Sequence, residues 1–161
     1  MSNREFSKIS PAVWRSGRFG ALDTEAKMLH LYYLSCEHQN SGGCFRLPDG
    51  YACSDLGWDV DKYRSCRDRV VNAGLISFDP ATFEIYVHRW FKHNPPMNDK
   101  HAIGTRRVID AIESDTIREL VEADFQIADE FRLAKVRKPD GLMLNDAHLL
   151  TTPRMQRGAA R

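Results

Sequence analysis

The segment from Arg89 to Arg107, RWFKHNPPMNDKHAIGTRR, carries the most varied side-chain chemistry in the chain. Trp90 and Phe91 are followed by alternating bases and histidines, then by a double proline and a second basic cluster. Two kinds of chemistry suit these residue types. Imidazole groups can bind a transition metal, whereas cations beside aromatic rings can hold phosphates and stack on unpaired bases.

Histidine and cysteine offer two candidate metal sites. The histidines of the basic segment lack a carboxylate or cysteine triad at ligand spacing, which argues against a catalytic metal. They are His88, His93 and His101. A zinc site around the stretch CEHQNSGGC stays an alternative, although its spacing matches no standard zinc template. Its ligands would be Cys36, His38, Cys44 and Cys53. Without zinc, these cysteines are expected to be reduced thiols.

The sequence contains none of the common enzyme motifs. There is no G-x-x-x-x-G-K-[ST] phosphate loop, no G-x-G-x-x-G fingerprint, no G-x-S-x-G elbow and no H-E-x-x-H zinc motif. The sequence therefore predicts a binding protein without a cofactor, not an enzyme.

Length and composition point to a small globular protein. A chain of 161 residues with 42% hydrophobic content suits one compact domain with extensions. The first residues, MSNREFSKIS, have no apolar core of signal-peptide length, and no window approaches a membrane span. A cytoplasmic protein is therefore expected.

The formal net charge of +1 conceals a strong asymmetry along the chain. Residues 1–20 and 88–107 are basic, 108–131 is acidic, and the sequence turns basic again from Arg132. Such zoning favours one surface for a polyanion such as DNA and another for a protein partner. Ordinary solvated helix surfaces can also cluster charge in this way.

Three helices and a strand are predicted before residue 75. LDTEAKMLHLYYLSCEH reads as an amphipathic helix that Asp23 can cap. After a glycine turn, CFRL is a short strand, and PDGYACSDLG is a short helix from Pro48 to Gly57. WDVDKYRSCRDRVVNAG is a longer helix, capped by Asp59 and ended by Gly74.

A β-hairpin and further helices follow. LISF and FEIYVHRW flank the turn DPAT, where proline suits the second turn position. Helical patterns resume after the double proline, and the residues from about 136 onwards lack periodicity. The predicted organisation is a domain over 1–95, a helical extension over 96–135 and a flexible basic tail over 136–161.

The order helix, strand, short helix, longer helix, hairpin is that of a winged helix. The expected fold class is therefore α+β, with three helices and a small antiparallel sheet that includes a wing hairpin, plus the C-terminal helical extension. The longer helix is expected to bury Tyr63, Cys66, Val70 and Ala73, with Arg67 nearer the core and reaching for solvent.

The exposed side of that longer helix carries the residues expected to meet base edges and phosphates of double-stranded DNA. They are Lys62, Arg64, Ser65 and Arg69. Asp61 and Asp68 are interleaved with these bases, and the wing tip DPAT is not basic. A winged helix that binds a protein partner instead of DNA therefore stays an alternative.

The opening segment leaves the hairpin through an elbow of two prolines, whose φ angles are fixed. Its cations can lie along a phosphate backbone. They are Arg89, Lys92, Lys100, Arg106 and Arg107. The aromatic pair either covers the sheet and anchors the next helix, or stacks on unpaired bases.

Several stretches resemble the winged-helix proteins of phages and prophages. They are FSKISPAVWRS, LDTEAKMLHLYYLSCEHQNSGGCFRLPDGY, GLISFD and RWFKHNPPMN. Over roughly residues 5–100 the layout is similar to the N-terminal domain of DnaD-type replication-initiation proteins. The resemblance implies a replisome organiser that binds origin DNA and helps a helicase-loading protein in the host cytoplasm. A second conserved domain of the DnaD type is not recognisable here, and a phage transcriptional regulator on the same fold is the alternative.

The acidic region 108–131 is expected to assemble the protein. Its apolar stripe includes Ile117, Val121, Ala128 and Phe131. This stripe either packs back on the winged helix or joins a second copy in a homodimer.

Overall fold

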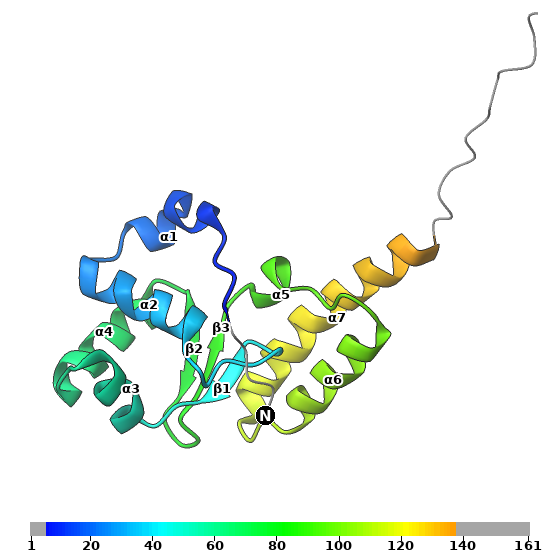
Figure 1. The fold of residues 1–161 in the computed structure, drawn as a ribbon. Helices are drawn as coiled ribbons and strands as arrows, with labels where there is room; N and C mark the ends of the chain where they lie inside the picture. Colours follow the sequence, from blue (N-terminus) through cyan, green and yellow to red (C-terminus); the bar gives the residue numbers. More distant parts are fainter. Residues whose placement is uncertain (1–5, 138–161) are drawn as a thin grey trace, which may run out of the picture.

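The computed structural model describes residues 6–137 (Figure 1). Over that range the chain forms seven α-helices, one 3-10 helix and a three-stranded antiparallel sheet. This mixed architecture confirms the expected α+β class. The last helix runs to Arg137, close to the predicted start of the tail. The rest of the predicted tail lies outside the described residues.

The elements follow one another in the order that Figure 1 colours from blue to orange. They are η1 (Pro11–Arg15), α1 (Gly17–Gly20), α2 (Thr24–Ser35), β1 (Cys44–Arg46), α3 (Asp49–Leu56), α4 (Val60–Asn72), β2 (Ile76–Asp79), β3 (Glu84–Val87), α5 (Trp90–His93), α6 (Asp99–Asp110) and α7 (Asp115–Arg137). In Figure 1 the helices α2 to α4 lie on one side of the sheet, and α5 to α7 lie on the other. One cluster of buried apolar side chains connects both groups of helices to the sheet.

Capping side chains set the boundaries of the helices in the first half. The carboxylate of Asp23 accepts a hydrogen bond from the backbone N–H of Ala26 at 2.9 Å, and Asp59 accepts one from Lys62 at 2.8 Å. Gly57 ends α3 in the left-handed region, with a φ of 64°. These observations confirm the predicted caps, since each depends on residues close together in the sequence.

The core side of α4 is largely as predicted. Tyr63, Cys66 and Val70 are fully buried, whereas Ala73 is only half-buried. The hydroxyls of Tyr33 and Tyr63 lie 3.0 Å apart and form a hydrogen bond between α2 and α4. Both hydroxyls therefore have a hydrogen-bond partner although both residues are fully buried.

Arg67 is the exception on α4. The sequence predicts that its side chain reaches solvent, but the residue is only 7% exposed. Its Nη1 donates a hydrogen bond to Oδ1 of Asp49 at 2.6 Å, and its guanidinium lies 3.8 Å from the centre of the Phe78 ring. The prediction was wrong because α3 supplies a carboxylate on the core side of α4, so the cation is paired inside the protein.

The three strands form a sheet in the order β1-β3-β2, with both pairs antiparallel. Ile85 of the central strand β3 pairs with Phe45 of β1 and with Phe78 of β2. All four residues of β3 are buried. Tyr86 points toward α7, where its hydroxyl donates a hydrogen bond to Asp124 at 2.5 Å. The helices thus cover both faces of this strand.

The second hairpin strand is shorter than the predicted FEIYVHRW. It ends at Val87, because Arg89 adopts a left-handed φ of 62° and Trp90 opens the short helix α5. The Trp90 indole donates a hydrogen bond to the carbonyl of Ser41 at 3.0 Å and is 6% exposed. Its ring lies against Gly43, where an added Cβ would be 2.3 Å from the Trp90 Cγ.

The aromatic pair therefore belongs to the core in this structure. Phe91 is 3% exposed, and its ring lies 5.3 Å from the ring of Phe125 on α7. This confirms the packing alternative, in which the pair covers the sheet and anchors the next helix. Stacking on bases would require both rings to leave the core.

The apolar stripe of the acidic region divides into two parts. Ile117 and Val121 are buried against the sheet, as the packing alternative predicts. Farther along α7, Ile127 is 68% exposed and Phe131 is 65% exposed. The homodimer stays a prediction, and these two side chains are where it would form.

Candidate nucleic-acid interface

Each cation predicted on the exposed side of α4 forms an ion pair with a carboxylate of the same domain. Lys62 Nζ lies 2.6 Å from Oε1 of Glu25, and Arg64 Nε lies 2.6 Å from Oδ2 of Asp49. Arg69 Nη1 pairs with Asp23, the residue that caps α2. Their side chains remain 36%, 56% and 41% exposed, in the order Lys62, Arg64, Arg69. These cations reach the surface, but each is already paired with a carboxylate there.

The most outward residues of α4 are acidic or neutral. Because Tyr63, Cys66, Arg67 and Val70 are buried, the helical period places a different set of side chains opposite them. They are Asp61, Ser65, Asp68 and Asn72, all exposed. Ser65 thus lies where the sequence predicts it, between two carboxylates. The outward face of α4 is therefore not electropositive.

Two of the carboxylates that pair with the cations of α4 have lowered pKa values. Burial would raise the pKa of Asp49, but hydrogen bonds from Arg64 and Arg67 outweigh it and lower that pKa below the usual value. The pKa of Asp23 is also lowered, first by the hydrogen bond from Ala26 and then by the nearby Arg69. Both groups are ionised at neutral pH, so both ion pairs persist there.

A second set of cations has no carboxylate partner among the described residues. These side chains are all exposed, and none takes part in an ion pair within residues 6–137. They are Arg89, Lys92, Lys100 and Arg107. They lie after the end of β3 and in α6, so all four belong to the segment from Arg89 to Arg107.

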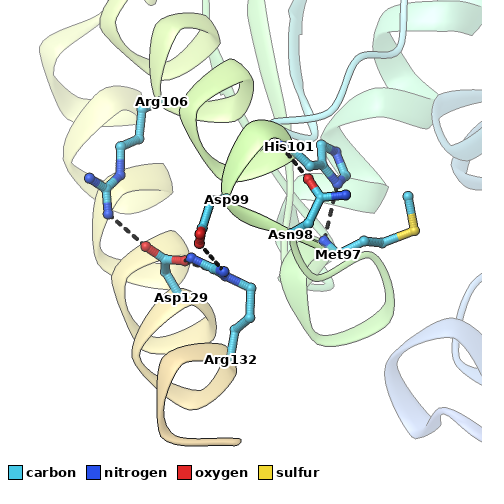
Figure 2. A network of polar contacts seen from close by, with 7 residues as sticks. All are labelled: Met97, Asn98, Asp99, His101, Arg106, Asp129 and Arg132. Carbon is cyan, nitrogen blue, oxygen red and sulfur yellow. Dashed lines mark hydrogen bonds and ion pairs between the residues drawn. The ribbon is translucent and has the colours of Figure 1, made fainter. Parts of the chain in front are cut away.

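Arg106 differs from the other cations of that segment. Figure 2 shows it in a network with residues of α7: its Nη2 lies 2.6 Å from Oδ2 of Asp129. Asp129 is 3% exposed and also accepts a bond from Arg132, which in turn pairs with Asp99 at 2.6 Å. Arg106 therefore holds α6 against α7 and is not free to pair with a phosphate.

The outward face of α6 carries two of the unpaired cations. Ala102, Thr105 and Ile109 of α6 are buried, and Lys100 and Arg107 lie on the opposite side of the helix, two turns apart. At the start of α6, Asn98 caps the helix and His101 accepts a hydrogen bond from the backbone of Met97 (Figure 2). The helix that positions these cations is therefore well anchored at its first turn.

Arg18 is a cation that the sequence reasoning did not assign to the site. Its Nη1 donates a hydrogen bond to the carbonyl oxygen of Gly74 at 2.8 Å, and Nδ1 of His88 lies 3.0 Å from that oxygen. One carbonyl thus joins residues 6–22 to residues 85–97. Both segments contain basic residues but no aspartate or glutamate, and 85–97 also contains two histidines. In the sequence, only the absence of acidic residues from both segments could have indicated that they lie together.

The candidate metal ligands do not converge. Nε2 of His88 lies 2.7 Å from the hydroxyl of Ser77, His93 is exposed at the end of α5, and His101 belongs to the start of α6. Between residues 6 and 137, no three His, Cys, Asp or Glu side chains are grouped so that they could hold a metal ion. This includes the set proposed for zinc. Burial raises the pKa of one of its thiols, Cys44, to about 12.

Comparison with family models, curated proteins and solved structures yields no match for the chain. Among the described helices, none combines the length and the apolar character that a bilayer crossing needs.

Proposed function

We propose that this chain is a DNA-binding protein with a winged-helix fold, and that it acts in phage-type DNA replication as a replisome organiser. The observation that carries the proposal is the set of exposed, unpaired cations in the segment that follows the hairpin and in α6. They are Arg89, Lys92, Lys100 and Arg107. Cations without a carboxylate partner are the ones that gain most from a phosphate, since they lose no ion pair on binding.

The order of the elements supports the winged-helix assignment. A helix-turn-helix formed by α3 and α4 is followed by the β2–β3 hairpin, and β1 pairs with β3 to complete the sheet. In such proteins the second helix of the pair enters the major groove while the hairpin lies beside it. The cations after β3 would then lie next to the wing and could reach the DNA backbone.

The ion pairs of α4 suggest that this helix contributes less to DNA binding than the sequence predicts. Exposed pairs contribute little to stability, so a phosphate can replace a carboxylate at modest cost. Arg64 is the easiest to release, because Asp49 would still be paired with Arg67. Asp61 and Asp68, however, would face the DNA and oppose deep entry of α4 into the groove.

Two double variants test which cations bind DNA. Lys100→Ala with Arg107→Ala removes two unpaired cations, and Arg64→Ala with Arg69→Ala removes two paired ones. The slope of log affinity against log salt should flatten by roughly 1.8 for the first, at about 0.9 per phosphate contact, and stay nearly unchanged for the second. The measurement is a duplex titration at several salt concentrations. The reverse ranking would make α4 the principal DNA-binding element.

The alternative of a protein-binding adaptor is favoured by the acidic and neutral outward face of α4. The two functions differ in how binding responds to salt. Affinity for duplex DNA should fall steeply as salt rises if the proposal is correct. A chain with no measurable affinity for DNA at low salt would leave the adaptor function as the better explanation.

Replication and transcription differ in where the protein binds. Genome-wide mapping of bound DNA should find repeats within a replication origin if the chain is a replisome organiser. Binding concentrated on promoter operators would instead indicate the phage transcriptional regulator. The mapping also tests whether the chain binds DNA in the cell at all.

The proposed homodimer is tested by Ile127→Asp with Phe131→Asp. Both side chains are well exposed in the single chain, so the free energy of unfolding should change by less than about 0.5 kcal/mol per residue. Sedimentation should show a dimer for the unchanged chain and a monomer for this variant, because a charge cannot be buried unpaired in the interface. An unchanged chain that sediments as a monomer contradicts the dimer.

A further inference from the structure

The first described residues form an arm with an exposed aromatic ring among cations. We define the N-terminal arm as residues 6–20, which contain Lys8, Arg15 and Arg18 but no aspartate or glutamate. The indole of Trp14 is 66% exposed, although tryptophan is a residue that proteins usually cover. Neither the winged-helix assignment nor the cations of α6 accounts for this ring.

The ring of Trp14 packs on buried aromatic side chains. Its ring lies 5.3 Å from the ring of Phe19 at an angle of 85°, and Phe19 lies 5.8 Å from His30 of α2. Phe19 is 1% exposed and His30 is 5% exposed, so the indole rests on the core. Burial lowers the pKa of His30 to about 4, which keeps this support uncharged at neutral pH.

The backbone that carries Trp14 is equally constrained. Ser10 accepts a hydrogen bond from Ala12 at the start of η1, where Pro11 fixes one φ angle. Ser16 accepts one from Phe19 and so caps α1. The ring is therefore presented on a short, doubly capped turn, which limits the conformational entropy that binding would cost.

The surroundings of Trp14 are suited to a polyanion. Arg15 and Arg18 are exposed on the same turn, and Arg18 contacts the carbonyl of Gly74 that His88 also contacts. Arg89 and Lys92, both exposed and unpaired, follow that histidine in the sequence. Figure 1 shows α1 and α5 at the same upper edge of the molecule. An aromatic platform flanked by unpaired cations is the arrangement that single-strand binding proteins use.

We propose that the N-terminal arm binds single-stranded DNA, with the Trp14 indole stacked on an unpaired base and Arg15 and Arg18 on the adjoining phosphates. The inference rests on the proposed DNA-binding function, and it assigns a second substrate class to a surface other than α4. A duplex hides the faces of its bases within the stack, so the indole has no base to cover there. The exposed ring is what favours the single strand.

The experiment uses the full chain and a fluorescently labelled oligo-dT of twenty nucleotides, with a mixed-sequence duplex as the second ligand. Trp14→Ala should weaken binding to the oligo-dT between about fivefold and 150-fold, the range expected for the loss of one base–aromatic stack. Trp14→Phe should retain most of the affinity, since a phenyl ring can also stack. Duplex affinity should stay within twofold for both variants.

Tyr51→Ala is the matched control, because Tyr51 on α3 is 58% exposed but lies outside the arm. It should leave binding to both ligands unchanged. A second readout is the indole emission, which oligo-dT should quench in the unchanged chain and much less in Trp14→Phe. Thermal unfolding of each variant establishes that a loss of binding is not a loss of fold.

The outcomes separate the two proposals. If the chain binds duplex but not oligo-dT, or if Trp14→Ala binds oligo-dT as well as the unchanged chain, the single-strand site is wrong and the proposed function stands. An equal loss for both ligands means that the indole contributes to binding without stacking on an unpaired base, which also overturns it. Binding of oligo-dT that depends on Trp14, without any duplex affinity, supports the site and overturns the duplex function.

Discussion

Asp49→Ala is expected to lower the free energy of unfolding by about 3–5 kcal/mol, the cost of leaving one member of a buried ion pair alone. Asp49 is the only carboxylate paired with Arg67 in the described part of the chain. The guanidinium carbon lies 3.8 Å from the centre of the Phe78 ring and 5.3 Å from that of Tyr63, and its Nε already lacks a partner. Without Asp49 the buried charge has nothing to offset its desolvation. Urea unfolding measures the change.

Three further variants identify the cause of that loss. Arg64→Ala removes only the exposed partner of Asp49 and should cost less than about 1 kcal/mol. Asp68→Ala removes an exposed carboxylate from α4 and should be nearly neutral. Adding Arg67→Met to Asp49→Ala should recover most of the stability, since an apolar side chain of similar length needs no partner. If Asp49→Ala unfolds at the same urea concentration as the unchanged chain, the buried pair is not stabilising.

The same pair gives a pH dependence with a definite sign. The pKa of Asp49 is lower in the folded chain than in the unfolded chain, where it is near 4, because the arginine hydrogen bonds outweigh the effect of burial. Its contribution is therefore complete above about pH 4 and is lost as the pH falls through the lower folded value. Below pH 4 the unchanged chain should lose stability more steeply than Asp49→Ala.

Gly43→Ala is expected to lower the free energy of unfolding by roughly 2–5 kcal/mol. Two effects add. The left-handed φ of 68° costs a residue with a Cβ about 1–2 kcal/mol. The new Cβ would also lie 2.3 Å from Cγ of Trp90, which forces the indole to move within a packed core at a further cost of about 1–3 kcal/mol. Thermal and urea unfolding measure the sum.

Gly50→Ala is the control for Gly43→Ala, and its effect should have the opposite sign. Gly50 lies in α3 with no atom within 4 Å of an added Cβ. Alanine is favoured over glycine within a helix by about 1 kcal/mol, so this variant should be slightly more stable than the unchanged chain. Equal effects at the two positions would show that the contact with Trp90 does not constrain the fold.

The local parts of this fold could be predicted from the sequence. The caps Asp23 and Asp59 and the glycine at the end of α3 depend on hydrogen bonds or backbone angles within a few residues. The buried stripe of α4 follows from the helical period. The end of β3 was predicted less well, because the left-handed φ of Arg89 is not encoded in an alternating apolar pattern.

The charges of the candidate site could not be predicted in the same way. Arg69 pairs with a carboxylate 46 positions away in the sequence, and Arg18 contacts a carbonyl 56 positions away. A helical wheel shows that a cation reaches the surface, but it does not show which carboxylate of another helix pairs with it. The sequence therefore identified the cations of α4 without revealing that other helices neutralise them.

The length of α7 has a geometric consequence. Its 23 residues span about 34 Å, at roughly 1.5 Å per residue. Asp129 is the last buried residue on it, so the final turns project past the body of the protein, as Figure 1 shows. The helix works as a rigid spacer: a probe attached near residue 136 would be held about one turn beyond Arg132, clear of the sheet and close to the start of α6. Energy transfer from that probe would therefore report how far a bound oligonucleotide lies from a fixed point on the protein.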